Sequence, residues 1–375
     1  MQIYVVEPGD TIDSIAERFS VTVEEISYVN QIPAPYSLAV GQALLVQTEG
    51  VSADRGRYSK GYAYPFISRW VLEQTLPYLS SLLIFSYGFN ADGQIVYPVG
   101  DDEWMIALAD DYGVNPVLVL TPIGEDGTFD NNRIHSMLSN NEARDRLIRE
   151  VTDVVNAKGY RGVDVDFEYI LREDRDSFTE FVALLTQTMN NIGIEVSVCL
   201  APKTSADQPG LLYEGKDYRG LGEAANEVLL MTYEWGYTYG PPMAVAPLNK
   251  VRQVVEYALT EIPPEKICIG IANYGYDWIL PFVKGESKAT TIGNVEAVQI
   301  AIRNDTDIEF APVSESPFFN YISAEREHEV WFEDVRSLRQ KYALVDEFGL
   351  KGIGVWQLMR LYRAMWYEYF GNVPV

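Results

Sequence analysis

Cysteine and histidine are scarce in this chain of 375 residues, which contains two of each. Cys199 and Cys268 each lie inside a short apolar run, which favours small buried core residues over a disulfide. His135 and His328 are too few for a histidine-rich metal site, and no metal-ligand spacing occurs elsewhere. We therefore expect neither a metal nor another cofactor.

Basic residues and long apolar runs are also few. Lysine and arginine number 29 against 54 aspartates and glutamates, so the net charge is −25. Because phosphate binding needs a basic surface, this balance argues against a nucleic-acid partner. No apolar run approaches the length of a membrane span, and the chain does not open with a basic segment followed by an apolar one. We expect a monomer with no signal peptide, no nucleic-acid partner and no membrane contact.

The most informative feature present is the segment 162–169, which reads Gly-Val-Asp-Val-Asp-Phe-Glu-Tyr. Asp164, Asp166 and Glu168 alternate with apolar residues, and a period of two is that of a β-strand. The three carboxylates then share one face, about 6–7 Å apart along the strand. Such crowding raises the pKa of a carboxyl group and can keep one acid protonated near neutral pH. The alternative is a solvated edge strand, although edge strands favour mixed charge and lysine.

A small domain is predicted over residues 1–48. A short strand at 3–6 leads into an amphipathic helix that carries Ile12 and Phe19 on its apolar stripe. Thr22 and Glu25 form a capping box at the start of a second helix, and a closing strand follows at 41–46. Residues 49–60 are polar and aperiodic, so we predict a linker there.

Residues 61–375 predict a (β/α)8 barrel, because eight short apolar runs alternate with helical patterns. An open doubly wound sheet is the alternative, but no Gly-X-Gly-X-X-Gly turn follows any run. A small α+β insertion is expected around 279–330. The eight runs are residues 61–65, 82–87, 117–121, 162–168, 194–201, 228–233, 267–271 and 352–356.

In such a barrel the chemistry lies at the carboxyl ends of the strands. The predicted strand ends carry acids, phenols and an indole, a combination suited to proton transfer and to stacking on sugar rings. These residues are Tyr87, Glu168, Tyr233, Asn273 and Trp356.

The small domain resembles a lysin motif (LysM), through Tyr4–Ile12, Ile15, Phe19, Ile26, Asn30–Ile32 and the segment 41–46. The resemblance implies binding of N-acetylglucosamine-containing glycans, in peptidoglycan or chitin, through two loops. Carried over, one loop is Gly9, Asp10, Thr11 and Ile12, and the other is Asn30, Gln31 and Ile32. The alternative is that these residues only cap helices and turn the chain.

The acidic strand resembles the signature of family-18 glycoside hydrolases, Asp-Gly-X-Asp-X-Asp-X-Glu, with Arg161 in place of the first acid. Met231–Glu234 resembles the family's Met-X-Tyr-Asp, and Trp356 matches the indole below the cleaved sugar. The arrangement of a lysin motif joined to such a barrel is similar to bacterial spore cortex-lytic N-acetylglucosaminidases. That likeness implies a spore or cell-wall location.

The resemblance also implies substrate-assisted, retaining catalysis. Glu168 would be the proton donor, Asp166 would orient the substrate's acetamido group, Tyr233 would bond its carbonyl oxygen, and Asp164 would share a proton with Asp166. Trp356, Tyr87, Glu234 and Asn273 are the expected substrate contacts. Three functions stay open at this point: cleavage after N-acetylglucosamine in peptidoglycan, a chitinase acting on chitin oligomers, and a non-catalytic wall- or coat-binding protein.

Overall fold

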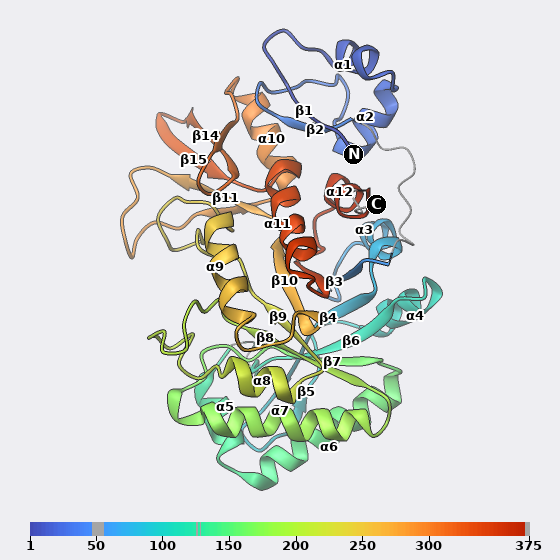
Figure 1. Cartoon of the computed structure of the whole chain (residues 1–375), viewed down its shortest axis with the longest axis vertical. Coiled ribbons are helices and arrows are strands. Elements are labelled where there is room, and N and C mark those ends of the chain that lie inside the picture. The colour runs from blue at the N-terminus through green and yellow to red at the C-terminus, as the bar shows by residue number, and fades with distance from the viewer. Residues whose placement is uncertain (47–55, 125–126, 128, 372–375) are drawn as a thin grey trace.

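The computed structural model describes residues 1–46, 56–124, 127 and 129–371 and consists of a small domain seated on a large barrel (Figure 1). The small domain has the predicted order of strand, helix, helix and strand. Its elements are β1 (Ile3–Val5), α1 (Ile12–Phe19), α2 (Val23–Asn30) and β2 (Ala43–Leu45). The two strands pair antiparallel, with Ile3 opposite Leu45.

The predicted capping box of the second helix is present. The Thr22 hydroxyl accepts a bond from the Glu25 amide at 3.1 Å, and the Glu25 carboxylate accepts one from the Thr22 amide at 2.7 Å. Thr11 caps the first helix in the same way through Ser14. These bonds satisfy amide groups that would otherwise be unpaired at a helix start.

The large domain is a closed barrel of eight parallel strands, which confirms the predicted fold class. Each strand pairs with its neighbours in sequence, and β3 pairs with both β4 and β16 to close the circle. The strands are β3 (Tyr58–Ala63), β4 (Ser81–Phe89), β6 (Asn115–Leu120), β7 (Gly162–Val165), β8 (Glu195–Leu200), β9 (Glu227–Leu230), β10 (Ile267–Ala272) and β16 (Gly352–Trp356). A two-residue strand, β5 (Ile95–Val96), pairs antiparallel with the end of β4.

Helices surround the barrel and bury their apolar faces against the outward side chains of the strands (Figure 1). They are α3 (Arg69–Thr75), α4 (Glu103–Asp111), α5 (Asn131–Leu138), α6 (Asn141–Lys158), α7 (Arg175–Asn190), α8 (Tyr218–Ala224), α9 (Leu248–Ala258), α11 (Val335–Phe348) and α12 (Arg363–Gly371). Among the described residues, no helix combines the length and apolarity that crossing a membrane requires.

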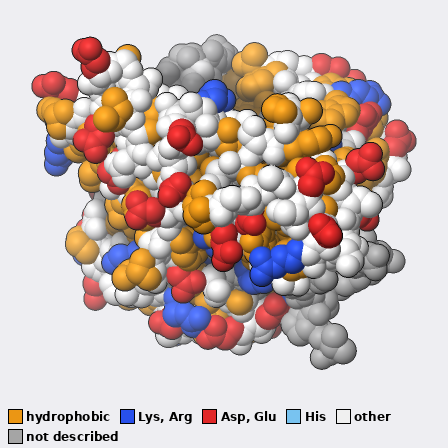
Figure 2. Space-filling view, turned by 90° about the horizontal axis from the view of Figure 1, so that it is seen from above, with side chains coloured by type: hydrophobic (Ala, Val, Ile, Leu, Met, Phe, Trp, Pro, Cys, Tyr) orange, Lys and Arg blue, Asp and Glu red, His pale blue; other side chains and the backbone are white. Residues whose placement is uncertain are grey.

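Both cysteines are buried and unpaired, as the sequence predicts. The excess of acidic residues is visible as scattered side chains on the face shown in Figure 2, where apolar and acidic groups are interspersed. Residues 49–55 of the predicted linker lie outside the described residues, and Tyr58, near its predicted end, already begins β3.

The predicted insertion forms a five-stranded antiparallel sheet covered by one helix. The sheet starts at Gly275, somewhat before the predicted position, and its strand order is β12-β11-β15-β14-β13. The elements are β11 (Gly275–Ile279), β12 (Thr290–Ile292), α10 (Asn294–Arg303), β13 (Glu309–Ala311), β14 (Ser316–Ser323) and β15 (Arg326–Trp331).

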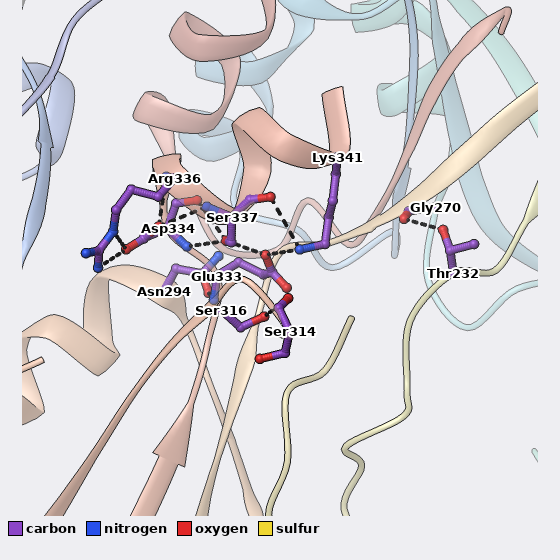
Figure 3. A network of polar contacts seen from close by, with 10 residues as sticks. All are labelled: Thr232, Gly270, Asn294, Ser314, Ser316, Glu333, Asp334, Arg336, Ser337 and Lys341. Atoms are coloured by element: carbon purple, nitrogen blue, oxygen red, sulfur yellow. Dashed lines mark hydrogen bonds and ion pairs between the residues drawn. The ribbon is translucent and has the colours of Figure 1, made fainter. Parts of the chain in front are cut away.

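A polar network at the start of α11 reaches the insertion, where the Glu333 amide donates to the Asn294 side chain at 3.0 Å (Figure 3), and it continues to the small domain. Asp334 caps the helix and holds the Arg336 guanidinium at 2.7 Å, and Arg336 also donates to the carbonyl of Gly41 in the small domain at 3.1 Å. Behind them, Glu333 and Lys341 form a fully buried ion pair at 2.8 Å. The network therefore fixes three parts of the chain at one point.

The small domain also shares apolar core with the barrel. Val29 and Leu45 are at most 2% exposed and belong to the same core as the barrel helices. Gln31 donates to the carbonyl of Leu361 at 3.1 Å and accepts from the amide of Arg363 at 2.8 Å. These contacts seat the domain on the barrel as part of the packed fold.

Candidate active site

An open cleft of about 700 Å³ lies at the carboxyl ends of the barrel strands. It brings together most of the side chains that the sequence predicts to act there, among many aromatic rings. Its lining residues are Tyr64, Phe85, Phe129, Asp166, Glu168, Tyr169, Leu212, Tyr213, Met231, Tyr233, Glu234, Tyr237, Tyr276 and Trp356.

Asp164 lies beneath this cleft, fully buried inside the barrel on β7. Its Oδ2 accepts a bond from the Tyr62 hydroxyl at 2.9 Å, and its Oδ1 accepts one from the Ser197 hydroxyl. The Lys60 ammonium lies 3.7 Å from the same Oδ1. Hydrogen-bond donors and a cation therefore surround this carboxyl group.

Asp166 lies one pleat higher, just past the end of β7, and is 7% exposed. Its amide donates to the carbonyl of Leu120 at 2.9 Å, so the backbone still follows the barrel. Its Oδ1 is buried with no hydrogen-bond partner among the described residues. Burial raises the pKa of Asp166 well above its usual value, and the negative charges of Glu168 and Asp164 raise it further. A carboxyl group in this position retains a proton more readily than an exposed one.

Glu168 follows on the same face and is partly open to the cleft. Burial raises its pKa, Lys216 opposes that increase, and Glu234 adds to it. Lys216 is itself buried, and its ammonium donates to the carbonyls of Phe167 at 2.6 Å and Cys199 at 2.9 Å. The result is an accessible carboxyl group beside a cation, with a pKa above its ordinary value, as a proton donor near neutral pH requires.

Tyr233 lies three residues beyond the end of β9 and lines the cleft with Glu168. The neighbouring Thr232 hydroxyl donates to the carbonyl of Gly270 at 2.9 Å, which holds this segment against β10 (Figure 3). A Cβ atom at Gly270 would lie 2.5 Å from the Tyr233 ring, so only glycine leaves room for it there. Burial raises the pKa of Tyr233 well above its usual value, and the phenol therefore remains a hydrogen-bond donor.

Trp356 ends β16 and forms part of the cleft surface. Three rings meet it edge to face, with centroid distances of 5.6 Å from Tyr62, 6.1 Å from Tyr64 and 5.0 Å from Phe85. Such contacts restrain the indole. Because flat faces can stack on sugar rings, this region suits a glycan.

Glu234, like Trp356, is a predicted substrate contact that lines the cleft. It adopts a left-handed backbone with φ of 68°. Its Oε1 accepts bonds from the hydroxyls of Tyr274 and, at 2.8 Å, Tyr276. Two phenols thus fix the carboxylate at the edge of the cleft.

Tyr87 does not lie in the cleft, which corrects the prediction from its place at a strand end. It is fully buried, and its hydroxyl donates to Asp102 at 2.5 Å, where Tyr160 donates as well. The register of β4 against β6 shifts between Ile84 and Tyr87. A bulge of this kind reverses the alternation of side chains, so Tyr87 points outward to the helices.

Asn273 is also absent from the cleft lining, contrary to the prediction. It is 3% exposed, and its side-chain amide donates to the carbonyls of Gln357 at 3.1 Å and Arg360 at 2.8 Å. Its own amide donates to the carbonyl of Trp356. Asn273 therefore braces the segment that follows Trp356.

The predicted glycan-binding residues of the small domain are largely occupied by structural contacts. The Asn30 side chain forms hydrogen bonds with the backbone of Ile26 and Leu45, and Gln31 bonds the barrel. The five other residues have different placements. Ile12 and Ile32 are buried core, Asp10 accepts from Tyr4 and from the Glu7 amide, Thr11 is a cap, and Gly9 is exposed.

Several lining residues and buried cations were not predicted. Lys60, Tyr62 and Tyr64 alternate on β3 and its extension, so the same period of two that identifies the acidic strand could have identified this face. The loop residues Leu212 and Tyr213 carry no such pattern, because they reach the cleft from the long connection after β8.

Arg161, which departs from the family signature, lies at the opposite end of the barrel. It pairs with Asp110 at 2.6 Å, and about half of its side chain (49%) is exposed. This position is therefore a surface ion pair, away from the cleft.

Comparison with known proteins identifies both parts of the chain. The family described as glycosyl hydrolases family 18 matches residues 78–360, and the LysM domain family matches residues 4–47. A cortical fragment-lytic enzyme of Bacillus subtilis is 34% identical, over 98% of this chain and 96% of that protein.

Solved structures agree with these matches. The spore cortex-lytic enzyme SleL of Bacillus cereus superimposes with a TM-score of 0.82 at 31% identity, over 99% of this chain and 86% of that one. SleL of Bacillus megaterium gives 0.81, also at 31% identity and with the same coverage. A chitinase of Chromobacterium violaceum shares the fold with a TM-score of 0.78 at 22% identity, over 85% of this chain and 100% of that one. The chain belongs to the family-18 glycosyl hydrolases and carries a LysM domain at its amino-terminal end.

Proposed function

We propose that this glycosidase hydrolyses β-1,4 bonds after N-acetylglucosamine in peptidoglycan, acting on spore cortex or fragments of it. The carrying observation is the arrangement of Asp166, Glu168, Tyr233 and Trp356 around one cleft. The Bacillus relatives, named for cortex fragments and spore cortex, share nearly the whole chain and support this substrate class and a spore or wall location.

The roles follow from the position of each group. Glu168, partly open and with a raised pKa, donates its proton to the glycosidic oxygen. The substrate's own acetamido oxygen attacks the anomeric carbon, which breaks the bond to the leaving sugar and forms an oxazolinium ion. Water then opens this ion, and Glu168 takes the proton that the water loses. No protein carboxylate becomes bonded to the sugar.

Asp166 and Tyr233 stabilise that intermediate. Asp166 lies between Asp164 and Glu168 with one buried oxygen unpaired, so it can accept from the acetamido N–H as positive charge develops. The Tyr233 phenol stays protonated and donates to the acetamido oxygen. Trp356 carries the sugar ring and excludes water from that side.

For the small domain we propose binding of the same kind of glycan, through the exposed backbone around Gly9 and Thr11. Deleting residues 1–48 is not a clean test, because Val29 and Leu45 belong to the barrel core. Point variants in the exposed loop separate retention on insoluble wall material from turnover of small substrates.

The function is tested by product analysis with the full chain. Defined cortex glycan fragments and chitin oligomers of equal length are each incubated with the protein, and products are identified by mass spectrometry. We expect new reducing ends at N-acetylglucosamine, with a clear preference for the cortex fragments. Faster turnover of chitin oligomers would show a chitinase, and the absence of any product would show a binding protein.

Glu168→Gln is the matched control in this assay. The amide keeps the shape of the side chain but cannot donate a proton as an acid, so the variant should bind fragments without cutting them. Undiminished cleavage would remove Glu168 from the proposed role.

A further inference from the structure

Lys60 is a buried charge that the proposed mechanism leaves without a role. It stands on β3 inside the barrel and is 1% exposed. Its ammonium lies 2.6 Å from Oε1 of Glu227 on β9 and 3.7 Å from Oδ1 of Asp164 on β7. A lysine is seldom buried this deeply unless its charge is paired.

Four side chains of alternating charge run from the barrel interior to the end of the barrel opposite the cleft. Asp164 faces Lys60, Lys60 faces Glu227, and Glu227 meets Lys351 at 2.6 Å through its other oxygen. Lys351 is partly exposed, with 24% of its side chain accessible. The row therefore starts directly below Asp166 and ends near solvent at the end opposite the cleft.

Geometry makes the Lys60 side chain hard to move. Its stem crosses the barrel beside Gly354, where an added Cβ atom would lie 3.4 Å from the lysine Cε. Burial alone would lower the pKa of Lys60, but Glu227 and Asp164 outweigh burial and hold it well above its ordinary value. Lys60 is thus a fixed positive charge.

We propose that Lys60 is a positioning residue for the acid pair, which keeps Asp164 ionised and thereby places the shared proton on Asp166. The inference rests on the proposed hydrolase function. The charge of Lys216 also acts on Asp166, but the Lys216 ammonium donates to the carbonyls of Phe167 and Cys199, and among the described residues no cation forms an ion pair with Asp166. The Asp166 Oδ1 has no hydrogen-bond partner among those residues, whereas Asp164 has donors on both oxygens and Lys60 at 3.7 Å. The proton therefore belongs on the upper acid, next to the substrate.

The side chains that contact Asp164 directly agree with this assignment. From β3 and β8 come three neutral donors and one cation, and the neighbouring positions of β6 are apolar. The groups that face Asp164, or act on it from farther away, are Lys60, Tyr62, Ser197, Cys199, Asp166, Lys216, Glu227, Cys268 and Lys351.

Two substitutions change the electrostatic field at Asp164 with opposite signs. Lys60→Met keeps the length of the side chain and removes the cation, while Glu227 retains Lys351 as its partner. Glu227→Gln removes the competing anion, so Lys60 interacts with Asp164 alone. Loss of a cation raises a carboxyl pKa, and loss of an anion lowers it.

The experiment is the pH dependence of kcat/KM on soluble cortex glycan fragments. For Lys60→Met, the acidic limb should move to higher pH by about 1 to 3 units, the range for removing an opposite charge at 4–6 Å. Glu227→Gln should move it to lower pH. Arg161→Met, which removes a surface cation paired with Asp110, is the matched control and should leave the limb in place.

The proposal would be overturned if the acidic limbs of Lys60→Met and Glu227→Gln coincided with that of the wild type. It would also be overturned if both limbs moved in the same direction. A purely structural ion pair would lower the melting temperature in both without opposite shifts. An inactive wild-type protein would instead contradict the hydrolase function. If Lys60→Met does not fold, Glu227→Gln against Arg161→Met still decides, because only the proposed role predicts a shift to lower pH.

Discussion

The barrel mouth and the loops of the small domain both carry residues that the sequence predicts to contact sugar, but the two regions use these residues differently. At the mouth, Asp166 keeps an unpaired oxygen and Glu168 remains open to the cleft. In the small domain, the side chains of Asn30 and Gln31 form hydrogen bonds with backbone groups of the fold. Buried polar groups that the fold leaves without a hydrogen bond are candidates for catalysis or binding. Polar groups whose hydrogen bonds are all made within the fold have a structural role.

The largest expected effect comes from the acid at the mouth. Glu168→Gln should lower kcat about 100- to 10,000-fold, because it removes a positioned proton donor. Turnover of soluble cortex fragments is the measurement. Asp10→Asn in the small domain is the matched change of carboxylate to amide and should leave that turnover unaltered. Equal losses in both would erase the distinction between the two regions.

Tyr233→Phe should have the next largest effect. Removing one preorganised donor to a developing charge costs about 100- to 1,000-fold in kcat. KM should change less, because the contact strengthens only as the intermediate forms. Steady-state kinetics on the same fragments separate the two parameters. Tyr87→Phe, a buried phenol outside the cleft, is the control, and a comparable loss of kcat there would argue against the assignment.

Asp166→Asn should raise stability while it lowers activity. Because the folded pKa of Asp166 is raised, the folded protein holds this proton to higher pH than the unfolded chain does. Stability is then lost as pH rises above the unfolded value of about 3.9. The variant should therefore melt higher at pH 7, by about 2 °C for a gain near 1 kcal/mol, and this gain should vanish near pH 4.

Asp164→Asn is the contrasting variant for that measurement. Asp164 accepts from Tyr62 and Ser197 and faces Lys60, so its amide should melt lower than the wild type at pH 7. Two neighbouring acids would then change stability with opposite signs. Lower melting of both variants would mean that the unpaired oxygen of Asp166 has no energetic cost.

The smallest effect is expected in the small domain. Gln31→Ala removes two hydrogen bonds to the barrel and should cost about 1–2 kcal/mol of unfolding free energy. Retention on insoluble cell wall should not change, since this side chain is already committed to the barrel. Gln2→Ala, an exposed glutamine of the same domain, should alter neither. Retention lost only in Gln31→Ala would show that the residue contacts glycan.

The periodicity and the residue types of the sequence predicted the features that are set within a single segment of the chain. The alternation around Asp166, the eight apolar runs and the capping box at Thr22 are local signals, and the structure has all three elements. The prediction for Tyr87 is wrong because a bulge in β4 turns its side chain to the other face of the strand. No residue type in this run indicates that shift. The contacts of Gln31 with the barrel were not predicted, because its partners lie more than 300 residues away in the chain. Positions set by pairing between distant segments are not readable from one segment.

The junction at the start of α11 has a consequence for how the two parts can be exchanged. Arg336 binds the carbonyl of Gly41, and a Cβ atom at Gly41 would lie 1.9 Å from the carbonyl oxygen of Ile308 in the insertion. A lysin motif transplanted from another protein would need a glycine at this site and a matching face toward α12. The small domain therefore cannot be exchanged as an independent unit. A different insertion in the barrel would also require changes in the small domain where the two are in contact.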